Sequence, residues 1–186
     1  MTRRHRPLRR FLRDARAVAA VEFALIFPLL LLLYFGTVEA ASLYTVDRRV
    51  ATVSSTMADL VSRERGCISN ATLNSYFAAA AAIMRPSDTT GMQQVVSLLK
   101  VASNGTVTVQ WSKPYPTTGT TTTLSTTTLP PKVNELARGK GWLVAAEISY
   151  PYTPVYGLVL NDITLAHTQF FLPRYEQEIK FQQAAC

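Results

Sequence analysis

Glu22 is the only charged side chain in an apolar run that extends from Val18 to Val38. An ionisable group inside a membrane span is expensive and usually marks a functional site. On insertion scales an unpaired ionised group at mid-bilayer costs about 2.5–3.5 kcal/mol, so a partner that neutralises Glu22 would favour docking. The alternative interpretation is a glutamate that stays hydrated near the lipid headgroups and has no such role.

The rest of the chain offers little for catalysis. Of its two histidines, His5 lies in the basic N-terminal tail and His167 stands alone in an expected strand, where a hydrogen-bonded structural role is the ordinary one. The sequence has no phosphate-binding loop, His-Glu-x-x-His or Gly-x-Ser-x-Gly motif. Asp162 beside Asn161 lacks the spaced oxygen ligands of a calcium site. We therefore expect no enzyme, no cofactor and no metal site.

Length and charge place the apolar run in a membrane. As a helix, the 21 residues from Val18 to Val38 would span about 31 Å, close to a hydrocarbon core of ~30 Å. Residues 1–17 hold seven arginines and one aspartate, which account for six of the net charge of +7. This tail fits the positive-inside rule, with a cytoplasmic N-terminus. Because the basic charge belongs to the tail and not to a folded face, we expect no nucleic-acid binding.

A cleaved secretory signal is the main alternative for this segment. The apolar core of such a signal measures about 7–15 residues and precedes an Ala-x-Ala-like cut. Here the apolar run is longer, and Ala15-Arg16-Ala17 stands before it. Arg9-Arg10-Phe11-Leu12 also lacks the residue that a twin-arginine signal has between Arg-Arg and Phe-Leu. A soluble, conventionally cleaved product is therefore the less favoured interpretation.

The N-terminal region resembles the TadE-like family, the minor pseudopilins of the tight-adherence (Flp) pilus system. The resemblance covers roughly residues 13–65 and is carried by Ala20-Val21-Glu22-Phe23-Ala24-Leu25, by Pro28 and the leucine run, and by Phe35-Gly36-Thr37-Val38-Glu39. It implies that a prepilin peptidase cuts between Ala17 and Val18, where the family usually has glycine before the cut, and leaves Glu22 at position five. It further implies that Ala17, Val18, Glu22 and Phe23 take part in processing, and Glu22, Pro28 and Glu39 in assembly.

The same resemblance implies a structural component of a pilus. Its partners would be the prepilin peptidase, the major Flp pilin, sister pseudopilins and the inner-membrane assembly platform. The chain would cross the bacterial inner membrane once, with a periplasmic head, and would end in or at the tip of an extracellular pilus. The alternative is an unprocessed, membrane-anchored periplasmic adaptor or chaperone of a pilus or secretion assembly.

Cys67 and Cys186 are the two cysteines of the chain. Both are expected on the outer, oxidising side of the membrane, which favours a disulfide over two free thiols. Such a bond would close a loop of about 120 residues, for which the entropic model gives roughly 4–5 kcal/mol. Neither cysteine lies in a Cys-x-x-Cys or His/Cys array, so a zinc site is not expected.

Hydrophobic spacing predicts two helices after the span. An amphipathic stalk over residues 39–66 has Gly66 as its C-cap, and a second, alanine-rich helix begins near Ser69 or Asn70 and is ended by Pro86. The inward-facing positions of the stalk recur at intervals of three and four residues: Leu43, Val46, Val50, Val53, Met57 and Leu60.

The remainder of the chain predicts a β-rich head over residues 67–186. Four strands are expected, at Val95–Val101, Thr106–Trp111, Trp142–Tyr150 and Ile163–Leu172, the first two joined by an Asn-Gly hairpin. Residues 114–131 form a Thr- and Pro-rich exposed loop. Tyr150–Gly157 is expected to pack over the sheet rather than to form an adhesive surface. The predicted fold is α+β: a long N-terminal helix and a roughly four-stranded antiparallel sheet packed on helices.

Overall fold

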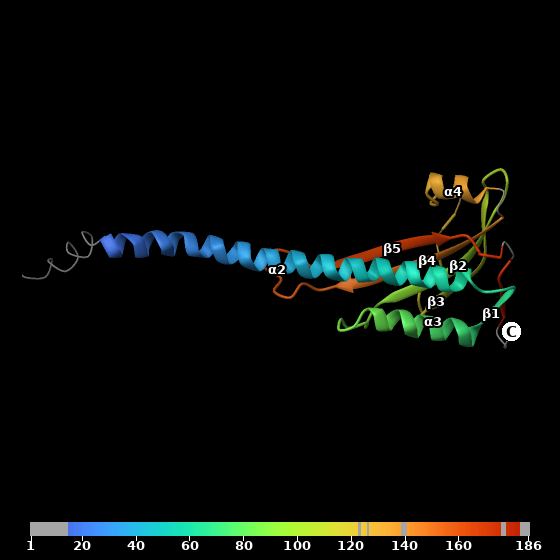
Figure 1. Ribbon diagram of the computed structural model, residues 1–186, viewed down its shortest axis with the longest axis horizontal. Helices are drawn as coiled ribbons and strands as arrows, with labels where there is room; N and C mark the ends of the chain where they lie inside the picture. Colours follow the sequence, from blue (N-terminus) through green and yellow to red (C-terminus); the bar gives the residue numbers. More distant parts are fainter. Residues whose placement is uncertain (1–14, 123, 126, 139–140, 176–177, 183–186) are drawn as a thin grey trace, which may run out of the picture. The chain divides into compact units, whose positions relative to one another are not determined.

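The computed structural model describes residues 15–122, 124–125, 127–138, 141–175 and 178–182. By the contacts among its residues the chain divides into two units. The first contains the chain up to Ser42 together with Pro154–Asn161, and the second contains Leu43–Thr153 and the chain from Asp162 onward. The elements, in chain order, are α2 (Ala15–Ser62), β1 (Cys67–Ser69), α3 (Asn70–Ile83), β2 (Gln93–Val101), β3 (Val107–Tyr115), α4 (Pro131–Ala137), β4 (Trp142–Tyr152), β5 (Ile163–Phe171) and β6 (Lys180–Gln182) (Figure 1).

Helix α2 is 48 residues long and continues through Pro28. It ends at Ser62, three residues before the end expected from the sequence, and Gly66, at φ 75°, leads into β1. A left-handed backbone at this position suits glycine, which has no Cβ to clash. The first part of α2 belongs to the smaller unit and the part from Leu43 to the larger one.

The larger unit contains a four-stranded sheet with the order β3-β2-β4-β5, in which every neighbouring pair is antiparallel. The α+β class and the four strands predicted from the sequence are thus confirmed. The β2–β3 hairpin turns at Asn104-Gly105, where Gly105 has φ 84° and its N–H donates to Ala102 O at 2.8 Å. The pairing shifts by one residue at Leu98/Leu99, as in a β-bulge.

One face of this sheet packs on helices. The stripe Val46, Val50, Val53 and Met57 of α2 is buried there, as its spacing predicts for an inward-facing helix surface. Helix α3 joins the same core; Ser69 caps its N-terminus and accepts a hydrogen bond from Thr72 N–H at 3.1 Å. The buried residues of α3 are Leu73, Phe77 and Ala80.

A second, smaller core covers other positions of β2 and β4. Leu99 and Val101 of β2 and Leu143 of β4 pack with Leu129 and with Ala137 of α4. Neither α4 nor the short parallel pair of β1 and β6, which forms a separate two-stranded sheet, was predicted from the sequence.

Candidate functional site

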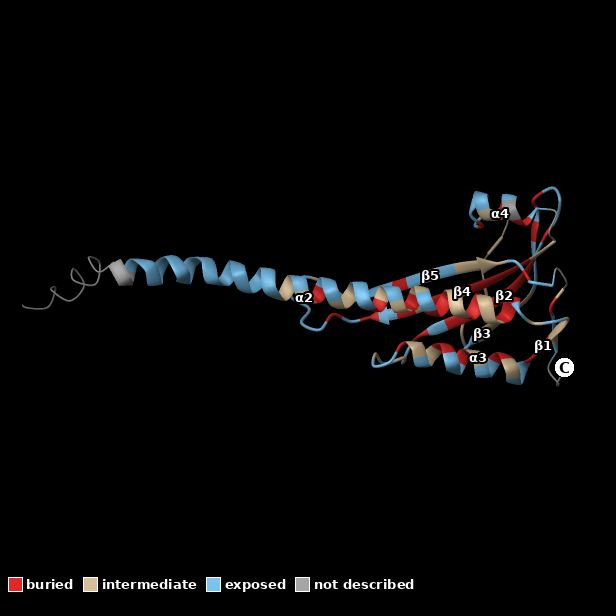
Figure 2. Ribbon diagram, in the orientation of Figure 1, coloured by how far each residue is buried: buried red, intermediate tan, exposed pale blue. Residues whose placement is uncertain are grey.

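The first part of α2 presents its apolar side chains to the outside. Val18 through Tyr34 are all exposed, and the segment is long and apolar enough to cross a membrane (Figure 2). Soluble domains rarely expose contiguous apolar surface of this kind, which marks a membrane or protein interface. This part of the chain is consistent with a single-pass membrane protein.

The predicted processing residues lie at the beginning of this helix. Ala17 falls within its first turn, and Val18 and Phe23 are 48% and 59% exposed. Glu22 is exposed as well. No ion pair joins Glu22 to another of the described side chains. Pro28 is exposed within α2.

Glu39, by contrast, is fully buried at the end of the smaller unit. Its carboxylate accepts hydrogen bonds from three consecutive backbone N–H groups: Leu158 N to Oε1 at 3.1 Å, Val159 N to Oε2 at 3.2 Å and Leu160 N to Oε2 at 3.1 Å. Hydrogen bonds between a carboxylate and backbone N–H groups are charge-assisted and strong. A carboxylate buried in this way holds the segment Pro154–Asn161 along the helix.

Electrostatics favour the ionised form of this carboxylate. Burial raises the pKa of Glu39, but the hydrogen bonds from the N–H groups of Leu158, Leu160, Val159 and Gly157 outweigh it, so the net pKa lies below the usual value for glutamate. Glu39 follows the apolar run Val18–Val38, so it is not part of the span itself. The sequence pointed to Glu39 by its family resemblance alone, and its amide partners were missed.

One aromatic contact and one apolar contact also join the segment Pro154–Asn161 to α2. The rings of Phe35 and Tyr156 meet edge to face with centroids 4.9 Å apart, and Gly36 faces Val159. Tyr150–Gly157 was predicted from the sequence to pack over the sheet. Tyr150 and Tyr152 are buried in the core of the sheet, whereas the stretch from Pro154 packs on α2 within the smaller unit, where Glu39 accepts hydrogen bonds from its amides.

Cys67, a predicted disulfide partner, begins β1 and is half-buried. In the parallel β1–β6 pair it stands in register with Lys180, six residues before Cys186 in the chain. Cys186 lies outside the described residues, so the Cys67–Cys186 disulfide stays a prediction.

Several polar side chains pair within the larger unit. His167 Nε2 lies 2.7 Å from Asp47 Oδ1, and Arg174 donates to Asp59 at 2.7 Å. Arg63 also bonds to Asp59, and the hydrogen bonds from Arg63 and Arg174 hold the pKa of Asp59 below its usual value. His5 lies outside the described residues. Across the described part of the chain, no three His, Cys, Asp or Glu side chains gather to hold a metal.

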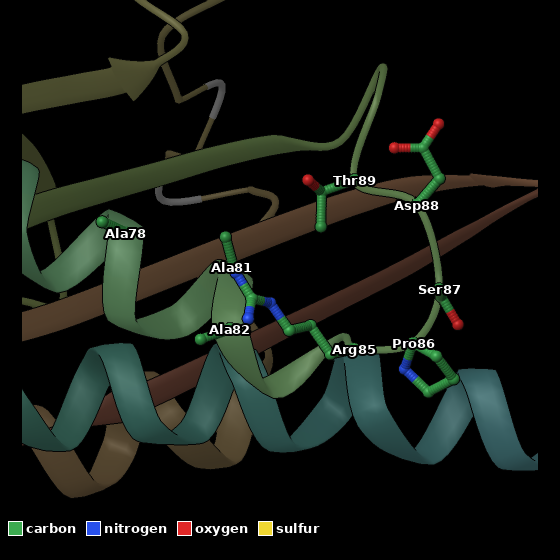
Figure 3. Close-up of a pocket in the computed structure, with 8 residues that line it drawn as sticks. All are labelled: Ala78, Ala81, Ala82, Arg85, Pro86, Ser87, Asp88 and Thr89. Carbon is green, nitrogen blue, oxygen red and sulfur yellow. The ribbon is translucent and has the colours of Figure 1, made fainter.

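A hollow lies at the end of α3. It measures about 500 Å³ and is lined mainly by Ala78, Ala81, Ala82, Arg85 and Asp88. Figure 3 shows Arg85 reaching back toward Ala81 while the Asp88 carboxylate points away from it. Asp88 accepts hydrogen bonds from Thr90 N–H and Oγ1 instead.

Comparison with known proteins finds a family match in the N-terminal helix. Residues 17–59 match the family model described as TadE-like protein, which confirms the resemblance over the apolar segment, Glu22 and Glu39. The TadE-like family is a structural family of tight-adherence pilus systems and is not known to contain enzymes. Comparisons with curated proteins and with solved structures found no match. The residues beyond 59 are therefore interpreted from their own structure.

Proposed function

We propose that the protein is a minor pseudopilin of a tight-adherence (Flp) pilus. The TadE-like segment that contains its apolar helix supports this proposal. A prepilin peptidase would cut between Ala17 and Val18 and free the amino group of Val18. The observation that carries the proposal is the position of Glu22, which is residue five counted from that new N-terminus and lies in the exposed apolar stretch of α2.

The mechanism follows from the cost of Glu22 in lipid. After cleavage, the Val18 amine of one subunit and the Glu22 carboxylate of its neighbour form a pair that neutralises both charges. The apolar stretch Phe23–Tyr34 packs side by side with the same stretch of neighbouring helices. Pairing fixes the axial register of each helix, and apolar packing holds it in the array.

The proposed partners in processing and assembly are those of a pilus system. They are the prepilin peptidase, the major Flp pilin, sister pseudopilins and the inner-membrane assembly platform. The N-terminus would be cytoplasmic and the larger unit periplasmic, until the subunit leaves the membrane for a place in the fibre or at its tip.

A second candidate function is an unprocessed membrane-anchored adaptor or chaperone of the same assembly. The observation that favours it is Ala17, since the TadE-like family usually has glycine before the cut. In that case the basic tail would serve as a topology signal, and the head would bind an assembly partner without entering a fibre.

The N-terminus of the protein purified from its native membrane decides between the two. Mass spectrometry should find a mature chain that begins at Val18. A strain without the prepilin peptidase is the matched control and should yield only the uncut chain. An intact N-terminus at Met1 or Thr2 in the presence of the peptidase would contradict processing and support the adaptor.

A further inference from the structure

The segment Pro154–Asn161 exposes an unusual amount of apolar surface for a loop. Val155, Tyr156, Leu158 and Val159 are 65%, 49%, 66% and 53% exposed. The segment carries no charged residue. It belongs to the same unit as the apolar stretch of α2, whose side chains are also exposed. The two apolar surfaces are joined at Phe35 and Gly36, which contact Tyr156 and Val159.

The position of these contacts along the helix corresponds to a membrane boundary. Phe35 follows Val18 by 17 residues, or about 26 Å of helix, so it falls close to the outer edge of a hydrocarbon core of ~30 Å. Tyr34, Phe35 and Tyr156 form a chain of ring contacts there. Aromatic side chains, tyrosine above all, concentrate at this depth, where one end of the ring is apolar and the other wet.

Three backbone N–H groups of the loop also have hydrogen-bond partners within the protein, as a poorly hydrated environment requires. Irregular backbone in lipid leaves N–H groups without hydrogen-bond partners, which is energetically costly. Here the buried Glu39 carboxylate takes the N–H groups of Leu158, Val159 and Leu160. A water-exposed loop would not require this arrangement, because water would satisfy those donors.

We propose that Pro154–Asn161 is a second membrane contact, whose apolar side chains enter the outer headgroup and acyl boundary of the bilayer beside the end of the α2 span. Glu39 is the positioning residue that holds this loop in the conformation that enters the bilayer. The inference rests on insertion of Val18–Val38, which the proposed function also requires, but not on processing or assembly. The contact would anchor the subunit at a fixed depth and orientation.

Tryptophan quenching tests the proposal on the full, uncut chain in nanodiscs of phosphatidylcholine brominated near the top of the acyl chains. Leu158→Trp and the milder Tyr156→Trp report on the loop. Val109→Trp, at an apolar position of β3 that is 42% exposed, is the matched control in the larger unit. Leu29→Trp reports on insertion of the span. Emission is compared with that of the unsubstituted chain, which contains Trp111 and Trp142.

The fluorescence that each new tryptophan, Leu158→Trp or Tyr156→Trp, adds to that of the unsubstituted chain should fall by about half in the brominated lipid. The reason is that an interfacial side chain lies ~5–10 Å into the headgroup and acyl boundary. Val109→Trp should not be quenched. Loop variants quenched no more than Val109→Trp would overturn the proposal; if Leu29→Trp is quenched at the same time, insertion and the proposed function survive. Absence of quenching at Leu29 would overturn both.

The role of Glu39 is tested in the same assay. Glu39→Ala in the Leu158→Trp background removes the acceptors of three amides, so quenching at position 158 should drop toward the Val109 level while quenching at position 29 is retained. Unchanged quenching at 158 would contradict the positioning role. A photo-crosslink from position 158 to a second copy, with no lipid quenching, would show that a neighbouring subunit covers the loop and would overturn the lipid contact.

Discussion

The two parts of α2 use apolar residues in opposite ways. From Val18 to Tyr34 nearly every side chain is apolar and exposed, whereas from Val46 to Val61 only one stripe is apolar and it is buried against the sheet of its own chain. The carboxylates differ in the same sense: Glu22 is exposed, and Glu39 is buried on backbone amides. The comparison teaches that the first part depends on an external environment for its stability, and the second on its own fold.

The largest effect is expected from Glu22→Gln. The substitution keeps the shape and removes the charge that would pair with a neighbour's amine, so filament assembly should be lost while membrane insertion persists. Sheared pili and the membrane fraction are measured in parallel. Glu135→Gln, at an exposed position of α4, is the control and should assemble normally. Normal piliation by the Glu22 variant would contradict the assembly role.

The predicted disulfide tests whether the larger unit is stabilised internally. Non-reducing peptide mapping should find a Cys67–Cys186 link. Cys67→Ser with Cys186→Ser should then lower the free energy of unfolding by as much as about 4–5 kcal/mol, the entropic value for a loop of this length. Two freely alkylated thiols in the native protein would refute the bond.

Two matched alanine substitutions, one in each part of α2, test the difference between the two parts directly. Met57 is fully buried, so Met57→Ala should destabilise the larger unit by roughly 2–5 kcal/mol through lost burial and a cavity. Leu29→Ala, at a 61% exposed position, should leave that stability unchanged. Denaturant unfolding followed by the fluorescence of Trp111 and Trp142 measures both. If both substitutions lowered the stability of the larger unit equally, the distinction between the two parts of α2 would be wrong.

The smallest effect concerns the beginning of α3. Ser69→Ala removes the hydrogen bond that the side chain accepts from Thr72 N–H, so stability should fall by about 1 kcal/mol. Ser69→Asn, which can still cap, should restore most of the loss. The same unfolding assay checks the pair, and an alanine variant as stable as the parent would show that the cap contributes nothing measurable.

The elements with a clear period could be predicted from the sequence. The alternation of Val107, Val109 and Trp111 gave a strand, and the Asn104-Gly105 pair gave its hairpin. The stripe from Val46 to Met57 gave the inward face of α2. Each of these patterns is local, so no knowledge of distant partners was needed to recognise it.

The missed features depend on partners far away in the chain. β1 and β6 have three residues each, too few to show a period, and they pair across more than a hundred residues. Helix α4 follows a threonine tract, and its one local signal was Pro131 at the first helical position.

Glu39 carried a signal that could have been recognised. It lies four residues before Leu43, on the same spacing of three and four that marks the buried stripe. A carboxylate at an inward position requires donors, because an unpaired buried charge is costly. The spacing could not identify those donors, since they are backbone amides of a loop about 120 residues later.

The contribution of α2 to the larger core has a practical consequence for producing the head without its membrane anchor. Val46, Val50, Val53 and Met57 cover one face of the sheet, so a truncated chain that starts at Cys67 would lay that face bare and would be prone to aggregate. A truncation that starts at Leu43 retains the part of α2 that packs on this face beside α3. It is therefore the starting point for crystallisation or for raising antibodies against the native surface.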